Sequence, residues 1–180
     1  MSFSKPTAGV VIGLAVLLLS APGASAASAC SAADATASRL SKRALVRATL
    51  CVLNAERARR DLGTLRLNRK LSTAARRHSQ AMVSWRFFSH DSADGASFVD
   101  RIRSTGYLSD ASGWYVGENI AYGSGTRSSP RSIGRAWMNS PPHRRNILSA
   151  SFREIGIGVA SDTPVGGGGA TYTTDFGQRS

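Results

Sequence analysis

Residues 137–148 read Trp-Met-Asn-Ser-Pro-Pro-His-Arg-Arg-Asn-Ile-Leu, a stretch that combines a helix end, a pair of prolines and a histidine. The helix that ends here is expected to begin at Ser129-Pro130, because proline at the first helical position lacks only an N–H that the helix would not use. It covers residues 130–139 and is stopped by Pro141-Pro142. His143 is therefore expected on a loop just past the helix, a place where functional side chains are common.

Five shorter segments flank this stretch along the chain. They are Leu53-Asn54-Ala55-Glu56-Arg57, Phe88-Ser89-His90, Gly117-Glu118-Asn119-Ile120-Ala121, Ile155-Gly156-Ile157-Gly158 and Asp175-Phe176-Gly177. Each is a weak signal alone, but in this order they extend over residues 41–177. Together they resemble bacterial members of the CAP family, which comprises cysteine-rich secretory proteins, antigen 5 and plant pathogenesis-related proteins.

The resemblance implies an α+β fold, a three-layer α-β-α sandwich with a small, mostly antiparallel sheet. Hydrophobic periodicity independently favours α+β, because helices come first and strands gather late. The expected helices cover residues 41–62, 70–85, 98–104 and 130–139. The expected extended segments cover residues 115–122, 155–159 and 171–176, the last two forming a hairpin about the glycines at 166–169.

The resemblance also implies a cleft in which two histidines and two acids converge and hold zinc in some relatives. Carried over by position, His90 and His143 are the histidines and Glu118 is the first acid. These three residues are the candidate metal ligands and also the candidate catalytic groups. The second acid of animal and plant relatives falls at Ser140 here, which removes one carboxylate and puts a four-residue site in doubt.

Other polar residues have simpler interpretations. His78 lies on the apolar stripe of its helix and is expected to be a core histidine bonded to backbone. Glu118 has the alternative role of a structural carboxylate that accepts from backbone N–H groups. Glu56 is expected to pair with arginines one turn on, and Glu154 is a conceivable substitute for the missing acid. Three aromatic residues are expected in the core: Phe88, Trp137 and Phe176.

The N-terminus indicates export. A short apolar run over residues 10–19 precedes Ala24-Ser25-Ala26, the small-x-small pattern that signal peptidase cuts. We therefore expect a signal peptide over residues 1–26, a lead-in over 27–40 and the CAP domain over 41–180, with no membrane span in the mature chain. Outside the cytoplasm the two cysteines, Cys30 and Cys51, are expected to form a disulfide; lipidation of Cys30 is the alternative.

The net charge is +12, which in an exported protein points to anionic cell-wall polymers, acidic glycans or lipid surfaces. No nucleic-acid motif is present, so nucleic acid is not expected as a partner. We expect a secreted monomer, associated with the cell wall or free.

Two classes of function follow. The first is a non-enzymatic module that binds a surface or a small ligand, with a cleft that binds a divalent metal, zinc above all, weakly. The alternative is a metal- or carboxylate-dependent hydrolase, a peptidase or glycan hydrolase, acting on the cell envelope. No His-Glu-x-x-His or Gly-x-Ser-x-Gly motif supports an enzyme.

Overall fold

The computed structural model describes Met1 and residues 30–180. The expected signal peptide lies, apart from Met1, outside the described residues, and its cleavage stays a prediction. The elements are α1 (Lys42–Ala58), β1 (Arg66–Leu67), α2 (Arg69–Ser84), α3 (Phe98–Ser104), β2 (Trp114–Gly123), α4 (Pro130–Asn139), α5 (Pro141–Leu148), β3 (Glu154–Ser161) and β4 (Ala170–Arg179), with short 3-10 turns at Ala37–Arg39 and Gly125–Ser128. In the described part of the chain no helix is long and apolar enough to cross a membrane.

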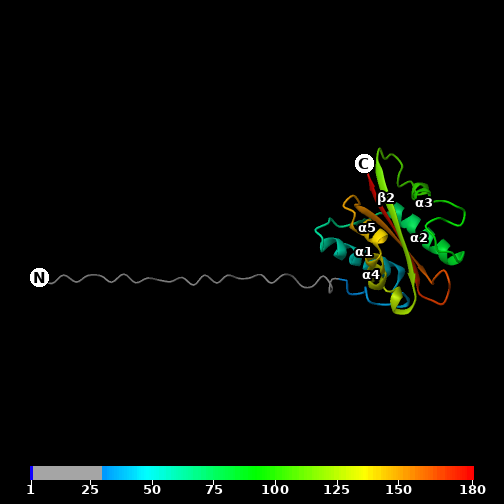
Figure 1. The fold of residues 1–180 in the computed structure, drawn as a ribbon, viewed down its shortest axis with the longest axis horizontal. Coiled ribbons are helices and arrows are strands. Elements are labelled where there is room, and N and C mark those ends of the chain that lie inside the picture. Colours follow the sequence, from blue (N-terminus) through cyan, green and yellow to red (C-terminus); the bar gives the residue numbers. More distant parts are fainter. Residues whose placement is uncertain (2–29) are drawn as a thin grey trace.

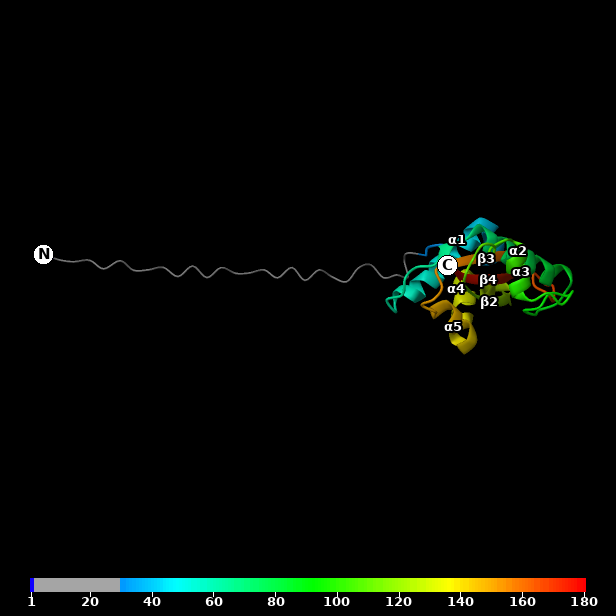
Figure 2. The same cartoon turned by 90° about the horizontal axis from the view of Figure 1, so that it is seen from above.

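The sheet has the strand order β1-β3-β4-β2. The β3–β4 and β4–β2 pairs are antiparallel and the two-residue β1 runs parallel to β3, so the expected α+β sandwich with a mostly antiparallel sheet is confirmed. Helices α2 and α3 cover one face, and α1, α4 and α5 lie on the other (Figure 1). Figure 2 shows β3, β4 and β2 in succession, with α5 beyond β2.

Two glycines of β3 let α2 lie directly on the sheet. A Cβ built on Gly156 would lie 2.0 Å from the carbonyl carbon of Leu71, and one on Gly158 would lie 2.2 Å from that of Ala75. No side chain fits such gaps, so the alternation of glycine with apolar residues records a close helix-to-strand approach. The apolar residues between the glycines face the other layer, where they join the main core.

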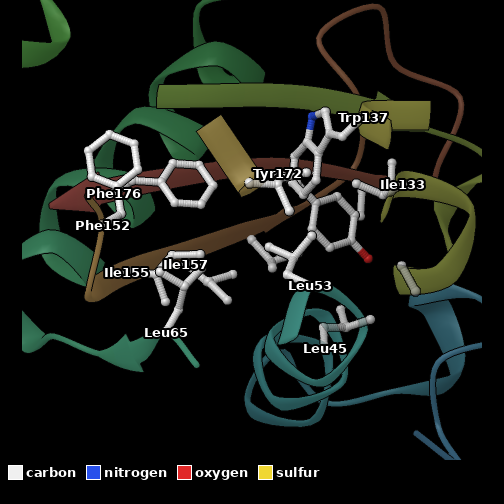
Figure 3. Close-up of a cluster of buried hydrophobic side chains, with 14 residues drawn as sticks. Leu45, Leu53, Leu65, Ile133, Trp137, Phe152, Ile155, Ile157, Tyr172 and Phe176 are labelled. Carbon is white, nitrogen blue, oxygen red and sulfur yellow. The ribbon is translucent and has the colours of Figure 1, made fainter. Parts of the chain in front are cut away.

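The core lies between the sheet and the α1, α4 and α5 layer (Figure 3). Trp137 is 1% exposed and its indole N–H donates to the Ile120 carbonyl over 3.0 Å. Phe176 is fully buried and stacks on Phe152. Both positions were expected in the core and are confirmed. Phe88 was also expected there, and that prediction is wrong: the residue is 45% exposed, because it follows the end of α2 on a loop.

Arg57 connects α1 to the segment around the end of α5. It is fully buried, and its guanidinium donates to the carbonyls of Gly63, Ile147, Ser149 and Phe152. These carbonyls include groups that a helix end leaves unbonded. The role of residues 53–57 is thus structural, and Glu56 forms the expected ion pairs with Arg59 and Arg60.

The lead-in is held against the first helix by the expected Cys30–Cys51 disulfide, which joins residues 21 positions apart. The amide of Arg131 also donates to the Ala33 carbonyl, and Asp34 pairs with the Arg131 side chain over 2.6 Å. The lead-in therefore contacts α1 through the disulfide and α4 through polar groups.

The prolines after α4 do more than stop it. Pro141 and Pro142 occupy the first positions of α5, so His143 lies in the first turn of a helix and not on a loop as expected. Ser140 ends one helix and begins the next. The physical reason is that proline breaks a preceding helix but is well suited to start a following one.

Candidate functional site

The candidate site lies at the outer edge of β2, the last strand of the sheet. His90 comes from the loop after α2, Glu118 from β2 itself and His143 from the start of α5. The two histidines thus approach the β2 edge from opposite layers, and His90 is, after burial, the second cause that lowers the pKa of His143. The structure therefore brings together residues that are far apart along the chain.

Glu118 is buried, with a side chain 1% exposed, and both of its carboxylate oxygens are occupied. His90 Nδ1–H donates to Oε1 over 2.8 Å, and Arg101 Nη2–H donates to Oε2 over 2.6 Å. Burial alone would raise the pKa of Glu118, but the His90 hydrogen bond and the Arg101 charge outweigh burial and lower it. The residue is a fixed carboxylate held by side chains rather than by backbone N–H groups.

Arg101 is a member of the site that the sequence did not reveal. It lies on α3, whose start is fixed by a capping box between Ser97 and Asp100. Its Nη1 donates to Ser92 Oγ and to the Ala96 carbonyl, and its side chain is only 11% exposed. As one of many arginines in the chain, it carried no local signal.

Asp175 is a second unforeseen member. It lies directly opposite Glu118 in the β2–β4 pair and is 1% exposed. Neither of its carboxyl oxygens meets a donor among residues 30–180. Burial, and then the charge of Glu118, raise the pKa of Asp175 well above its usual value, so it keeps its proton to a higher pH than an ordinary aspartate. A lone acid in the middle of a buried strand was the available sequence signal.

His143 is oriented by the residue that replaces the second acid. Its Nδ1 and Ser140 Oγ share a hydrogen bond of 2.7 Å, so a hydroxyl here contacts the histidine without bringing a negative charge. Burial, and then the charge of His90, lower the pKa of His143. The ring therefore stays neutral to a lower pH than an ordinary histidine.

The Gly-Glu-Asn segment fixes α5 against β2. Asn119 Nδ2 donates to the His143 carbonyl, and Asn146 Nδ2 donates to Asn119 Oδ1 and to the Glu118 carbonyl. Gly117 makes room for this contact, since a Cβ there would lie 3.1 Å from Asn146 Oδ1. The motif thus places Glu118 on one side of the strand and anchors the helix of His143 on the other.

Two further candidates lie outside the cleft. His78 is 1% exposed and its Nε2 bonds the Ser89 carbonyl over 2.9 Å, as expected for a core histidine. Glu154 does not replace the missing acid: its oxygens accept from Asn68 Nδ2 and Tyr107 Oη, each over 2.7 Å, on another part of the sheet. No feature of the sequence had indicated where the Glu154 side chain would point.

An aromatic rim borders the loop that carries His90. Phe88 packs edge-on against Tyr122, with ring centroids 4.9 Å apart, and both are more than 40% exposed. Trp85, at the end of α2, is 62% exposed. Phe88 lies two residues before His90, and Tyr122 lies on β2, the strand of Glu118. Apolar surface therefore adjoins the charged groups.

The candidate site offers few donors to a metal ion. Within the described residues no group of three or more His, Cys, Asp or Glu side chains is arranged to hold a metal. His90 and His143 each use Nδ1 in a hydrogen bond to a neighbour, which leaves Nε2 of each ring as a nitrogen donor. Two histidine nitrogens suit zinc or copper, with Glu118 orienting one of them.

Comparison with known proteins supports the expected fold and family. The family model described as the cysteine-rich secretory protein family (CAP) matches residues 50–175. The chain belongs to this family. The uncharacterized protein YkwD of Bacillus subtilis is 37% identical over 123 residues, covering 68% of this chain and 43% of YkwD. The B. subtilis membrane protein YlbC is 30% identical over 110 residues, covering 61% of this chain and 30% of YlbC.

Solved structures of similar proteins agree with the fold. An extracellular SCP-domain protein from Bacillus anthracis is 26% identical, with a TM-score of 0.61, covering 76% of this chain and 43% of that one. An outer surface protein of Borrelia burgdorferi is 18% identical, with a TM-score of 0.63, covering 78% of this chain and 97% of that one. This CAP chain spans less than half the length of the two curated relatives.

Proposed function

We propose that this CAP protein acts outside the cell as a non-catalytic binding module whose cleft, formed by His90, Glu118 and His143, binds a small ligand or a divalent metal weakly. The observation that carries the proposal is the state of Glu118, whose two oxygens are already engaged by His90 and Arg101. A carboxylate engaged in this way holds the side chains of His90 and Arg101 in position.

The same state argues against catalysis by Glu118. A general base works best with a pKa near the working pH and with a free lone pair at the substrate. The pKa of Glu118 is lowered instead, and Ser140 supplies a hydroxyl where a second carboxylate would stand. The cleft therefore lacks a pair of carboxyl groups free to exchange protons with a substrate.

Zinc is the metal that the donor set favours. His90 and His143 would bind it through their Nε2 atoms, and Glu118 would hold His90 in place. A bound zinc would supply a Lewis acid in the cleft. With only two protein ligands, binding should be weak, easily reversed by chelator and lost in acid, because a protonated imidazole cannot ligate a metal.

Titration calorimetry with zinc tests this part of the proposal. We expect heat in the parent, little in His90→Ala or His143→Ala, and unchanged or tighter binding in Ser140→Glu. His78→Gln is the matched control, because His78 lies in the core, and it should bind like the parent. Parent-like binding by both cleft variants would refute the assignment, and absence of heat in the parent would refute metal binding altogether.

A hydrolase is the second candidate, and one observation favours it. A histidine bonded through Nδ1 to a buried carboxylate, with its other nitrogen free, is the arrangement of a general base in many hydrolases. His90 has this arrangement and its side chain is 49% exposed. Incubation with labelled peptidoglycan and with casein, with and without zinc, tests it: release that is lost in His90→Ala would establish an enzyme.

Export and surface binding complete the proposal. The apolar run and Ala24-Ser25-Ala26 support export, and the similar B. anthracis protein is described as extracellular. The intact mass of the exported protein should match a start near Ala27. The charge of +12 supports attraction to anionic surfaces, so purified cell walls should retain the protein at moderate salt; a protein that washes off would contradict this part.

A further inference from the structure

A basic groove lies at the opposite edge of the sheet from the histidine cleft. It has a volume of about 700 Å³ and lies where α1 and α2 flank β3 (Figure 2). This volume is within the usual range for ligand sites, about 300–1,000 Å³. The lining residues are Lys42, Arg43, Val46, Arg47, Leu67, Asn68, Arg69, Ser72, Thr73, Arg76, Ile157 and Val159.

The groove exists because β1 covers only the start of β3. Arg66 and Leu67 pair with Glu154 and Ile155, and then the chain turns into α2 at Arg69. No described strand pairs with the outer edge of β3 beyond Ile155. The two helices form the walls, and apolar side chains of the strand line the space between them.

The charge of the groove is unbalanced. Its lining includes five basic residues and no acidic one. All five are exposed, and none of their side chains forms an ion pair or a hydrogen bond with another described residue. These residues are Lys42, Arg43, Arg47, Arg69 and Arg76. Elsewhere in the described chain arginines form ion pairs with acids, for example Arg131 with Asp34 and Arg103 with Asp100. Like charges gathered without partners repel one another, so an anion would be stabilised there.

The spacing of the charges indicates the shape of that anion. Arg43 and Arg47 are one turn apart on α1, and Arg69 and Arg76 are two turns apart on α2, about 10 Å at 1.5 Å per residue. Positive charge therefore extends along both walls instead of converging on one point. Such a pattern fits a chain with repeated anionic groups better than a single small anion.

The remaining lining residues narrow the chemistry. None of them is aromatic, so nucleic-acid bases would find no stacking surface. Ser72 and Thr73 can bond hydroxyl groups, and the apolar residues can contact a carbon skeleton. Arginine, which accounts for four of the five cations, presents paired donors that match phosphate oxygens.

We propose that this groove binds an extended polyol-phosphate chain, a polymer of hydroxylated carbon units joined by phosphodiesters. The inference rests on the surface-binding part of the proposed function and names its site. It is independent of the histidine cleft, which lies at the other edge of the sheet. The arginines contact successive phosphates from both walls, and the polyol carbons lie over Val46 and Leu67.

The test is a titration of a fluorescent glycerol-phosphate oligomer of about ten units, followed by anisotropy. Arg43→Gln/Arg76→Gln removes one charge from each wall, and Arg127→Gln/Arg135→Gln removes the same charge from an exposed surface outside the groove. We expect the groove variant to bind about tenfold more weakly and the control to stay within about threefold. The salt slope should fall by about two in the groove variant. Unchanged melting temperatures verify folding.

Each other outcome is decisive. Equal weakening in both double variants would refute the groove as the binding site but would leave general attraction to anionic surfaces in place. No binding by the parent would refute both claims. Single-stranded DNA of equal charge, or phosphatidylglycerol vesicles, bound more tightly through the same two arginines would replace the polyol-phosphate with another ligand. Loss of binding in His90→Ala would move the polymer to the cleft.

Discussion

Asp175 is a buried acid beside the candidate site, and its pKa is raised well above the ordinary value. It is buried directly opposite Glu118, and burial, followed by the charge of Glu118, raises its pKa, so between the ordinary and the raised value the folded protein binds a proton that the unfolded chain has released. Stability from this group is therefore present below the ordinary aspartate pKa, near 3.8, and declines as pH rises toward the raised folded value.

Asp175→Asn should remove this loss of stability at rising pH. An amide cannot ionise and can donate to Glu118, so the variant should melt a few degrees higher than the parent at pH 7–8 and similarly near pH 4. Asp91→Asn, an exposed acid on the His90 loop, is the control and should match the parent throughout. Calorimetric melting across this pH range gives the answer; a destabilised Asp175→Asn at neutral pH would mean that the ionised form is needed.

His78 gives a pH dependence of the opposite sign. Burial lowers its pKa from 6.5, so the unfolded chain binds more protons than the folded protein once pH falls below 6.5. The free energy of unfolding should then decrease as pH falls from 6.5 toward the lowered folded value. His78→Gln keeps a donor for the Ser89 carbonyl and should show a flatter profile between pH 7 and 5 in urea titrations. Parallel profiles would show that His78 does not titrate in this range.

Among single residues, the sequence singled out three of the five side chains described at the candidate site. His90, Glu118 and His143 stood in recognisable segments, and the structure brings them to one edge of the sheet. Arg101 and Asp175 were not identified, because their roles depend on which elements pack together. A side chain that pairs across a sheet or between layers leaves no local pattern.

Among the elements, α4 and α5 show why the positions of the prolines predicted only part of the helical structure. The end of α4 at Asn139 was predicted, but the helix that begins at Pro141 was not. Proline excludes a helix before it and favours one after it, and only the path of the chain decides whether the second helix forms. Likewise β1, two residues long, is too short for any periodicity to indicate.

The packing of α4 yields a prediction that separates core from site. Trp137 is buried among α1, β2 and β4 residues (Figure 3), so Trp137→Ala should lower the free energy of unfolding by roughly 3–5 kcal/mol. His143→Ala, close by in the sequence, removes a ring at the surface end of α5 and should melt close to the parent. Chemical denaturation of both variants measures the difference, and a reversed order would show that the assignments are exchanged.

For the whole molecule, the order of helices and strands predicted the α+β class, the strand and glycine pattern predicted the closing hairpin, and the family resemblance implied the layers. What the order could not predict is where charge gathers. The excess of basic residues was evident from composition. The concentration between α1 and α2 of five cations that have no ion-pair partner among the described residues follows from the short β1 and the path into α2.

The last prediction concerns how the lead-in contributes to the stability of the domain. The Cys30–Cys51 bond closes a loop of 21 residues, and a crosslink of this size restricts the unfolded chain by about 3 kcal/mol on the chain-entropy model. Cys30→Ser/Cys51→Ser should lose about that much in urea unfolding, and its m-value should rise because the unfolded chain exposes more surface without the crosslink.

Asp34→Ala is the control: it breaks the exposed pair with Arg131 and should change little, because surface ion pairs contribute little. If instead Asp34→Ala were the more costly change, the polar contacts of the lead-in with α4 would hold it in place. A lipid-sized mass on Cys30 of the exported protein would mean that the disulfide does not form there.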